Sequence, residues 1–384
     1  MTVAQSKLAW IQSLRGIAVF LVVLTHARYG FLDTPTWPLA ETLLRPGAFG
    51  VDLFFVISGF IMVHTTRRSD GSARYALDFL IKRFARIWPL YAVATLAWLL
   101  ATYGNLDFLA NAQVLRNLAL SLSFQPVDPN APMYFGATLP LGWTLNFEMY
   151  FYLVFAAGLL LDRWRWLFLL AWVLLSVIAL PAFTRSLTFD VMSNFGFSIA
   201  YLNLVTNPIV LEFFAGALIG WCFNQDWFRV QSAAVCRHIL FLSIAIVVWY
   251  VYSGLGSFHG PRQWGWAAAL LVLGMALASK TVAIAPPPVL IWLGTISYSL
   301  YLTHTTVQLV AGLQVERLGG DTHGWMHIVL TTALSISVAA LVHHYLEEKM
   351  SLRVRAALLS AADRWFGRGG RSASADAGAV LRQP

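Results

Sequence analysis

The fold class of this chain is decided by residues 14–26, which read LRGIAVFLVVLTH. The segment is apolar enough for the interior of a bilayer, yet it holds both an arginine and a histidine. At about 100° per residue, the eleven steps from Arg15 to His26 come within roughly 20° of three full turns, so both side chains share one helix face about 16 Å apart. Ionisable side chains at bilayer depth are costly and by default indicate a functional site. The pair therefore predicts a membrane helix that carries part of such a site.

The composition extends this interpretation to the whole chain. The 384 residues are 58% hydrophobic and 11% charged, whereas a soluble domain carries about 25% charged residues. Phe and Trp are abundant, with 26 and 16 copies. We therefore predict an all-α, polytopic integral membrane protein.

A spanning helix needs about 20 mostly apolar residues, and about ten segments approach that description. They are 9–28, 49–66, 87–103, 142–161, 164–183, 208–223, 236–253, 263–279, 288–313 and 325–346. Segment 114–124 is too short to span, and we expect it to lie at a membrane interface.

The distribution of Lys and Arg predicts the orientation. With the N-terminus in the cytoplasm, basic residues favour the inner side by roughly three to one, as the positive-inside rule requires. Both termini are then cytoplasmic, and the protein is a multi-pass protein of the inner (plasma) membrane. The same bias explains the net charge of +8 by topology, so we predict no nucleic-acid partner.

We expect one membrane domain over residues 1–350 and a basic, disordered cytoplasmic tail over residues 351–384. The two cysteines, Cys222 and Cys236, cannot build a disulfide framework. No His, Cys and carboxylate residues have the spacing of metal ligands, so we predict no metal site.

Three ionisable groups are predicted to occupy the outer half of the bundle: His26, Asp52 and Glu148. A carboxylate that binds one imidazole nitrogen fixes the tautomer and strengthens the other nitrogen as a base. The alternative is that each group is a packing device that pairs with another helix.

Two further patterns stand out. Arg83 and Arg86, at i and i+3, share a helix face and can bind phosphate oxygens, although such segments also bind anionic lipid or follow the positive-inside rule. Tyr298, Tyr301 and His304, spaced by three, form a polar stripe that either lines a cavity or bonds to a neighbouring helix.

Five motifs in chain order give these residues a common context. They are the Arg-x10-His pair, the run GVDLFFVISGF (50–60) that contains Asp52 and Ser58, RFAR (83–86), WTLNFEMYFY (143–152) and SYSLYLTH (297–304). Together they resemble the membrane acyltransferase family 3, whose members acylate cell-surface carbohydrates and some small molecules. Residues 50–62 and 142–152 are most similar to exopolysaccharide-production acetyltransferases.

The resemblance implies an acyl-coenzyme A donor, with acetyl the commonest acyl group in the family, and a carbohydrate hydroxyl as acceptor. It implies that His26 is the catalytic base, that Arg15 is a companion residue in the site, and that Arg83 and Arg86 belong to the donor site. We predict that Arg15 also helps to bind the donor. We predict that Asp52 or Glu148 orients His26, and that Ser58 belongs to the cavity with the Tyr298–His304 stripe. Membrane lipids and the machinery of polysaccharide synthesis are the expected partners. Direct transfer and an acyl-enzyme route are both compatible with these residues.

Three alternatives stay open. The chain could be a transporter or flippase for a lipid-linked sugar, although transporters often show two related halves and none is visible here. It could be an acyltransferase with a small-molecule acceptor. A structural partner in a polysaccharide-export complex would not need five motifs rich in reactive side chains.

Overall fold

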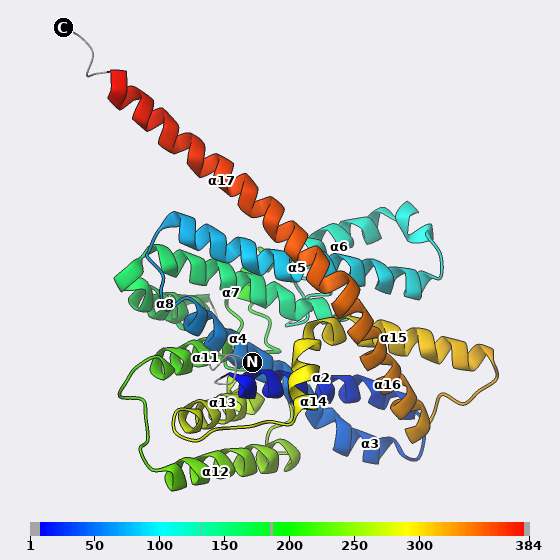
Figure 1. The fold of residues 1–384 in the computed structure, drawn as a ribbon. Coiled ribbons are helices and arrows are strands. Elements are labelled where there is room, and N and C mark those ends of the chain that lie inside the picture. The colour runs from blue at the N-terminus through cyan, green and yellow to red at the C-terminus, as the bar shows by residue number, and fades with distance from the viewer. Residues whose placement is uncertain (1–7, 132, 185–186, 380–384) are drawn as a thin grey trace.

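The structure is a computed structural model that describes residues 8–131, 133–184 and 187–379, with side chains as far as residue 366. Within these ranges the regular elements are all helical, as predicted (Figure 1). In chain order the α-helices are α2 (Ala9–Ala27), α3 (Trp37–Leu44), α4 (Phe49–Thr65), α5 (Ala73–Tyr103), α6 (Ala112–Leu122), α7 (Trp143–Leu160), α8 (Arg165–Val173), α9 (Leu180–Thr184), α10 (Ala200–Val205), α11 (Val210–Phe223), α12 (Ala233–Tyr252), α13 (Trp266–Ser279), α14 (Pro288–Thr295), α15 (Ser297–Arg317), α16 (Trp325–Val342) and α17 (Glu348–Ala379).

Among the described residues, fewer helices have the length and hydropathy of a membrane span than the ten segments that we predicted. The described residues contain seven helices that are long and apolar enough to cross a membrane. The other three predicted spans are 208–223, 263–279 and 288–313. The first two contain α11 and α13, with 14 residues each, which at about 1.5 Å per residue reach roughly 21 Å and fall short of a 30 Å hydrocarbon core. The predicted orientation also uses Lys7, Arg185 and Arg382, which lie outside the described residues.

The third of these spans is broken into two helices. We predicted one helix over 288–313, but α14 ends at Thr295 and α15 begins at Ser297. Between them Ile296 has φ −85° and ψ 4°, so the chain leaves the α-helical conformation there. Figure 1 shows that the two helices meet at a steep angle.

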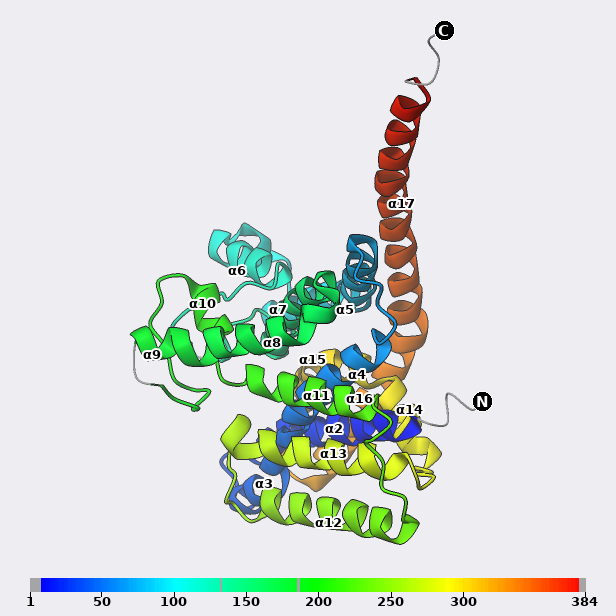
Figure 2. The ribbon, with the colours of Figure 1, turned by 90° about the vertical axis from the view of Figure 1, so that its left-hand side faces the viewer.

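Helix α2 lies inside the bundle, packed against α4, α14, α15 and α16 (Figures 1 and 2). Its contact with α14 is backbone to backbone. A Cβ on Gly16 would come within 2.3 Å of Leu290 O, and a Cβ on Gly294 would come within 1.9 Å of Gln12 O. Small residues permit such close helix packing in membranes. The contact places the α14–α15 break directly beside the face of α2 that carries Arg15.

Helix α5 is long enough to extend beyond the membrane. It begins after Ser72, whose hydroxyl caps it by accepting the Tyr75 N–H at 3.0 Å, and ends at Gly104, which has a φ of 71°. Its 31 residues cover about 46 Å, against about 30 Å for a hydrocarbon core. The excess of about 16 Å, roughly the first eleven residues, can therefore project from the bilayer, and it ends beside Arg83 and Arg86.

The C-terminal tail is helical where we expected disorder. Helix α17 starts at Glu348 and runs along α5 before it leaves the bundle (Figures 1 and 2). Arg74 of α5 binds the carboxylate of Asp363 at 2.7 Å. The stretch is rich in the strong helix formers Ala, Leu and Arg, and the contact with α5 gives its apolar face a partner. The Gly- and Ser-rich end of the tail favours disorder, whereas these earlier residues favour a helix.

Candidate active site

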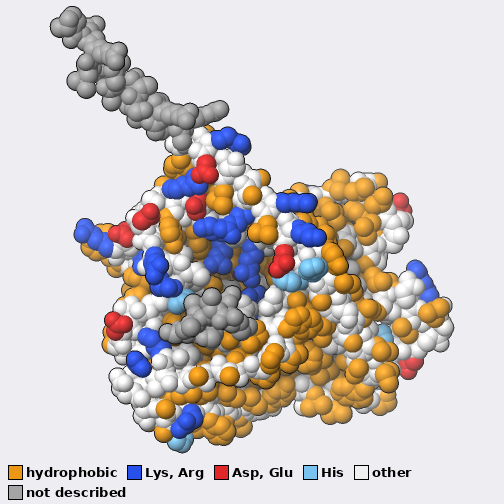
Figure 3. Space-filling model, in the orientation of Figure 1, with side chains coloured by type: hydrophobic (Ala, Val, Ile, Leu, Met, Phe, Trp, Pro, Cys, Tyr) orange, Lys and Arg blue, Asp and Glu red, His pale blue; other side chains and the backbone are white. Residues whose placement is uncertain are grey.

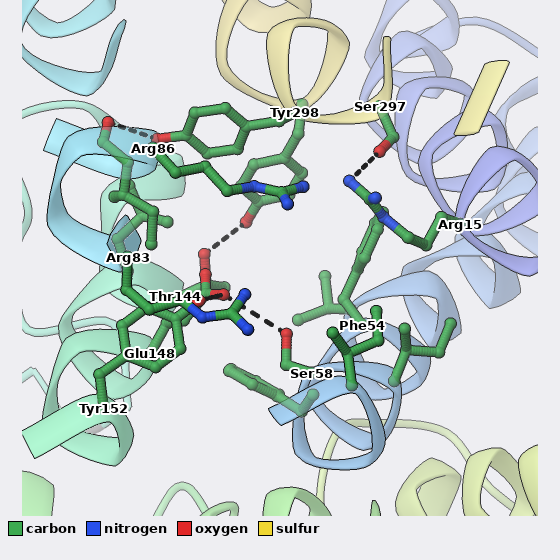
Figure 4. Close-up of a pocket in the computed structure, with 17 residues that line it drawn as sticks. Arg15, Phe54, Ser58, Arg83, Arg86, Thr144, Glu148, Tyr152, Ser297 and Tyr298 are labelled. Atoms are coloured by element: carbon green, nitrogen blue, oxygen red, sulfur yellow. Dashed lines mark hydrogen bonds between the residues drawn. The ribbon is translucent and has the colours of Figure 1, made fainter. Parts of the chain in front are cut away.

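A cavity of about 100 Å³ lies between α2, α4, α5, α7 and α15 (Figure 4). The guanidinium groups of Arg15, Arg83 and Arg86 all reach its lining. Arg15 is held on two sides, because Nη2 donates to Ser297 Oγ at 2.8 Å and Nη1 donates to Gln12 Oε1 at 3.2 Å. The structure thus brings together the three arginines that the sequence predicted for a donor site. We call this space the central cavity.

Glu148 also faces the central cavity, and our prediction that it orients His26 is wrong. Its carboxylate accepts hydrogen bonds from Tyr152 Oη and from Ser58 Oγ, the latter at 3.4 Å. In the part of the chain that the structure describes, none of the three arginines forms an ion pair with it. Three cations and one carboxylate leave this cavity with a positive balance that suits an anionic or strongly polarised ligand.

The imidazole of His26 is paired with that of His304. His26 Nδ1 lies 2.9 Å from Val22 O and 3.2 Å from His304 Nε2, and His304 Nδ1 lies 2.9 Å from Leu300 O. Carbonyl oxygens only accept, so in the neutral rings both Nδ1 atoms carry hydrogen and His304 Nε2 accepts from His26. This pattern leaves His26 Nε2 with a free lone pair, which is the state that a general base needs.

His26 lines a second cavity, of about 140 Å³, which we call the histidine cavity. His259, Trp143 and Tyr134 face the same space. Partial burial against Trp143, whose ring centroid lies 5.3 Å away, raises the pKa of Tyr134 to about 12. The Tyr134 hydroxyl is therefore neutral near pH 7 and can both donate and accept hydrogen bonds there.

Asp52 supports His259, and our prediction that it orients His26 is also wrong. Its Oδ2 lies 2.7 Å from His259 Nδ1, and its Oδ1 accepts the Gly260 N–H at 3.1 Å. Asp52 is fully buried, so this contact holds the ring of His259 with Nδ1 toward the carboxylate. The sequence did not single out His259, which lies 207 positions away in a loop. The only available signal was the general need of a buried aspartate for a partner.

The predicted stripe on α15 serves both of the roles that we left open. Tyr298 and Tyr301 line the central cavity, and Tyr301 lines the histidine cavity as well. Each also bonds to a neighbouring element: Tyr298 Oη donates to Ile87 O at 2.7 Å, and Tyr301 Oη lies 2.9 Å from Thr144 Oγ1.

A third, larger cavity of about 420 Å³ adjoins the central one, and we call it the basic cleft. Four cationic side chains line it: Lys82, Arg83, Arg86 and Arg355. Figure 3 shows Lys and Arg side chains gathered around a hollow on this face of the molecule. Arg83 and Arg86 line the central cavity too, just as Val51 and Tyr301 line both the central and the histidine cavities. The three cavities are therefore consecutive.

Among the described residues, no group of three or more His, Cys, Asp or Glu side chains is placed to hold a metal ion.

Comparison with known proteins gives these cavities a context. The family model described as "Acyltransferase domain" matches residues 8–344. The exopolysaccharide production protein ExoZ of Rhizobium meliloti is 31% identical over 317 residues, which cover 82% of this chain and 93% of ExoZ. Nodulation protein 10 of Rhizobium leguminosarum bv. viciae is 26% identical over 90% of this chain and 94% of its own length.

A more distant relative carries a named reaction. The peptidoglycan O-acetyltransferase OatA of Listeria monocytogenes is 24% identical over 77% of this chain, which spans 48% of OatA. No solved structure matches the chain.

Proposed function

This chain belongs to the acyltransferase family whose domain covers residues 8–344, and from that premise we propose that it acetylates a polysaccharide. The donor is cytosolic acetyl-coenzyme A. The acceptor is a hydroxyl group of an exported or surface polysaccharide, or of its lipid-linked precursor. The relatives named for exopolysaccharide production and peptidoglycan O-acetylation support this choice of acceptor.

The observation that carries the proposal is the series of three cavities. The basic cleft leads to the central cavity through Arg83 and Arg86, and the central cavity leads to the histidine cavity past Val51 and Tyr301. An anionic donor with a long, neutral arm fits such a series, because cations are concentrated at one end and a base lies at the other.

Coenzyme A supplies that shape. Its phosphates would bind in the basic cleft, where arginine can fork onto phosphate oxygens. Its pantetheine arm would cross the central cavity, where Arg15 is held by Ser297 and Gln12. The thioester would then reach His26. We assign the basic cleft to the cytoplasmic side of the inner membrane, in keeping with the excess of Lys and Arg predicted there.

His26 is the proposed general base. Its free Nε2 removes the proton of the acceptor hydroxyl while that oxygen attacks the thioester carbonyl. The new C–O bond forms, the C–S bond breaks, and the imidazolium returns the proton to the thiolate of coenzyme A. His304 contributes by holding His26 Nδ1–H at 3.2 Å, which keeps the correct nitrogen free.

His259 and Tyr134 are proposed to hold the acceptor on the opposite side of the same cavity. Asp52 accepts the Nδ1–H of His259, so Nε2 of that ring is left to accept a hydrogen bond from a sugar hydroxyl. Both residues lie in segments between helices, at the end of the bundle that we assign to the outer face.

The test is turnover of labelled acetyl-coenzyme A by purified protein. We expect release of coenzyme A that depends on an added polysaccharide, and loss of O-acetyl groups from the surface polysaccharide of cells that lack the gene. Turnover only with a small molecule would move the acceptor to that class. No turnover with any acceptor, together with sugar-lipid transport, would favour the flippase alternative.

A further inference from the structure

The basic cleft has a second wall that the sequence did not predict. One wall is α5, which supplies Lys82, Arg83 and Arg86. The other is the start of α17, where Ser351 and Arg355, at i and i+4, share one helix face and Leu352 lies beside them. A cationic side chain from the C-terminal helix therefore faces the three from α5 across about 420 Å³ of space.

The charges of this cleft are unbalanced. The acidic residue in its described lining is Asp78, whose carboxylate is paired with Arg74 at 2.9 Å. Across the described side chains, no carboxylate lies within ion-pair distance of Lys82, Arg86 or Arg355. Cations that face one another without counter-charges indicate a site for a polyanion.

Helix α17 is fixed on both sides of Arg355. Before it, the buried Glu347 accepts from Ser299 Oγ at 2.6 Å and contacts His343 Nδ1 at 2.8 Å, which ties the chain to α15. After it, Asp363 binds Arg74 of α5 at 2.7 Å. The guanidinium of Arg74 also lies 5.5 Å from the ring of Phe366. The position of Arg355 over the cleft is therefore set by contacts on two other helices.

We propose that α17 completes the donor site, and that Arg355 and Lys82 together bind the 3′-phosphate of coenzyme A. The proposal rests on the proposed use of a coenzyme A thioester. Arg83 and Arg86 line both the basic cleft and the central cavity, so they meet the diphosphate, from which the pantetheine arm departs. Lys82 and Arg355 line the cleft alone, on the side away from the arm, where the 3′-phosphate of the ribose would lie.

A lipid headgroup offers the same phosphate chemistry. The nucleotide is favoured because the cleft adjoins the central cavity through Arg83 and Arg86, and the charged Arg15 and Glu148 of that cavity suit a polar pantetheine arm better than the acyl chain of a lipid. The two sources differ in one feature that can be removed, since 3′-dephospho-coenzyme A lacks a single phosphate and is otherwise the same ligand.

The experiment measures binding of coenzyme A and of 3′-dephospho-coenzyme A to the full chain in phosphatidylcholine nanodiscs. Arg355→Gln is compared with Arg353→Gln, which changes an exposed arginine of the same helix outside the cleft. Lys82→Gln, on α5, serves as an independent variant. We expect Arg355→Gln and Lys82→Gln to weaken coenzyme A binding about tenfold, as for loss of one charge-assisted hydrogen bond, and to leave 3′-dephospho-coenzyme A nearly unchanged. Arg353→Gln should bind both ligands like the parent protein.

Several results would overturn the proposal. Unchanged coenzyme A affinity in Arg355→Gln would remove α17 from the site while leaving the proposed acetyl transfer intact. Equal weakening of both ligands would indicate a structural role. Loss of the preference for the 3′-phosphate on adding phosphatidylglycerol to the nanodiscs would identify a lipid site. Failure of the parent protein to bind coenzyme A at all would remove the proposed donor as well.

Discussion

The two ends of the cavity series are built in different ways. The basic cleft takes three of its four cations from five consecutive positions of α5, and its charged groups are exposed or half-buried. The histidine cavity takes His26 from α2, and the supports of its two imidazoles come from distant segments: His304 on α15 for His26, and Asp52 on α4 for His259.

This difference suits the chemistry that we propose for each end. Binding a flexible polyanion needs charge in the right region, and several arrangements of long side chains supply it. Proton transfer needs one nitrogen of one ring with the correct tautomer, and that requires hydrogen bonds fixed by packing. Changes at the first end should therefore alter affinity, whereas changes at the second should alter the rate of the chemical step.

The largest effect is expected at the histidine end. His26→Ala should lower kcat by about 10² to 10⁴, the usual contribution of a general base. His238→Ala is the matched control, because its Nδ1 also contacts the carbonyl four residues earlier, at 2.8 Å, but it lies outside the three cavities. If the kcat of His26→Ala for acetyl transfer is within threefold of that of the parent protein, His26 is not the general base.

At the donor end, the double change Arg83→Gln with Arg86→Gln should raise the KM for acetyl-coenzyme A about 10²-fold, because two charge-assisted phosphate contacts are lost. The kcat should change much less. Arg163→Gln with Arg165→Gln is a suitable control, since these arginines lie over tryptophan rings away from the cleft. A fall in kcat at unchanged KM would reverse the assignment of the two ends.

His304 should have an intermediate effect through its contact with His26. We expect His304→Ala to lower kcat about tenfold, because His26 Nδ1–H keeps only Val22 O of its two acceptors and the ring is less well fixed. His304→Gln, whose amide oxygen can accept the same hydrogen bond, should recover part of the loss. Equal activity of the two variants would assign His304 to packing alone.

The smallest change is expected from Asp52→Asn. The hydrogen bond that holds His259 weakens, so the KM for the polysaccharide acceptor should rise several-fold to tenfold. The KM for acetyl-coenzyme A should stay unchanged. A thermal unfolding curve separates this effect from lost stability, since Asp52 is fully buried. A change in the donor KM alone would contradict the assignment of His259 to the acceptor.

The sequence predicted features that depend on local periodicity. The all-helical class, the shared face of Arg83 and Arg86, and the polar stripe from Tyr298 to His304 follow from spacing along one helix. The matched family then confirmed the resemblance that rested on five motifs. Seven of the predicted spans coincide with helices of the described residues that are long and apolar enough to cross a membrane.

The partners of these side chains could not be predicted, because depth along a helix does not define which neighbour a side chain faces. The sequence predicts Asp52 and Glu148 beside His26 only because all three are expected in the outer half of the bundle. In the structure Glu148 contacts Ser58, and Asp52 contacts His259. Nor does composition predict the break at Ile296 or the close packing of α14 on α2 beside it.

The most direct test of the account is coenzyme A binding by two variants whose acetyl transfer is impaired for different reasons. Helix α5 should govern this binding, and α2 should govern turnover. We predict that His26→Ala binds coenzyme A like the parent protein although it does not transfer acetyl groups, and that Arg83→Gln with Arg86→Gln binds it about 10²-fold more weakly. Loss of binding in His26→Ala, or normal binding in the arginine variant, would contradict the separation of donor binding from proton transfer.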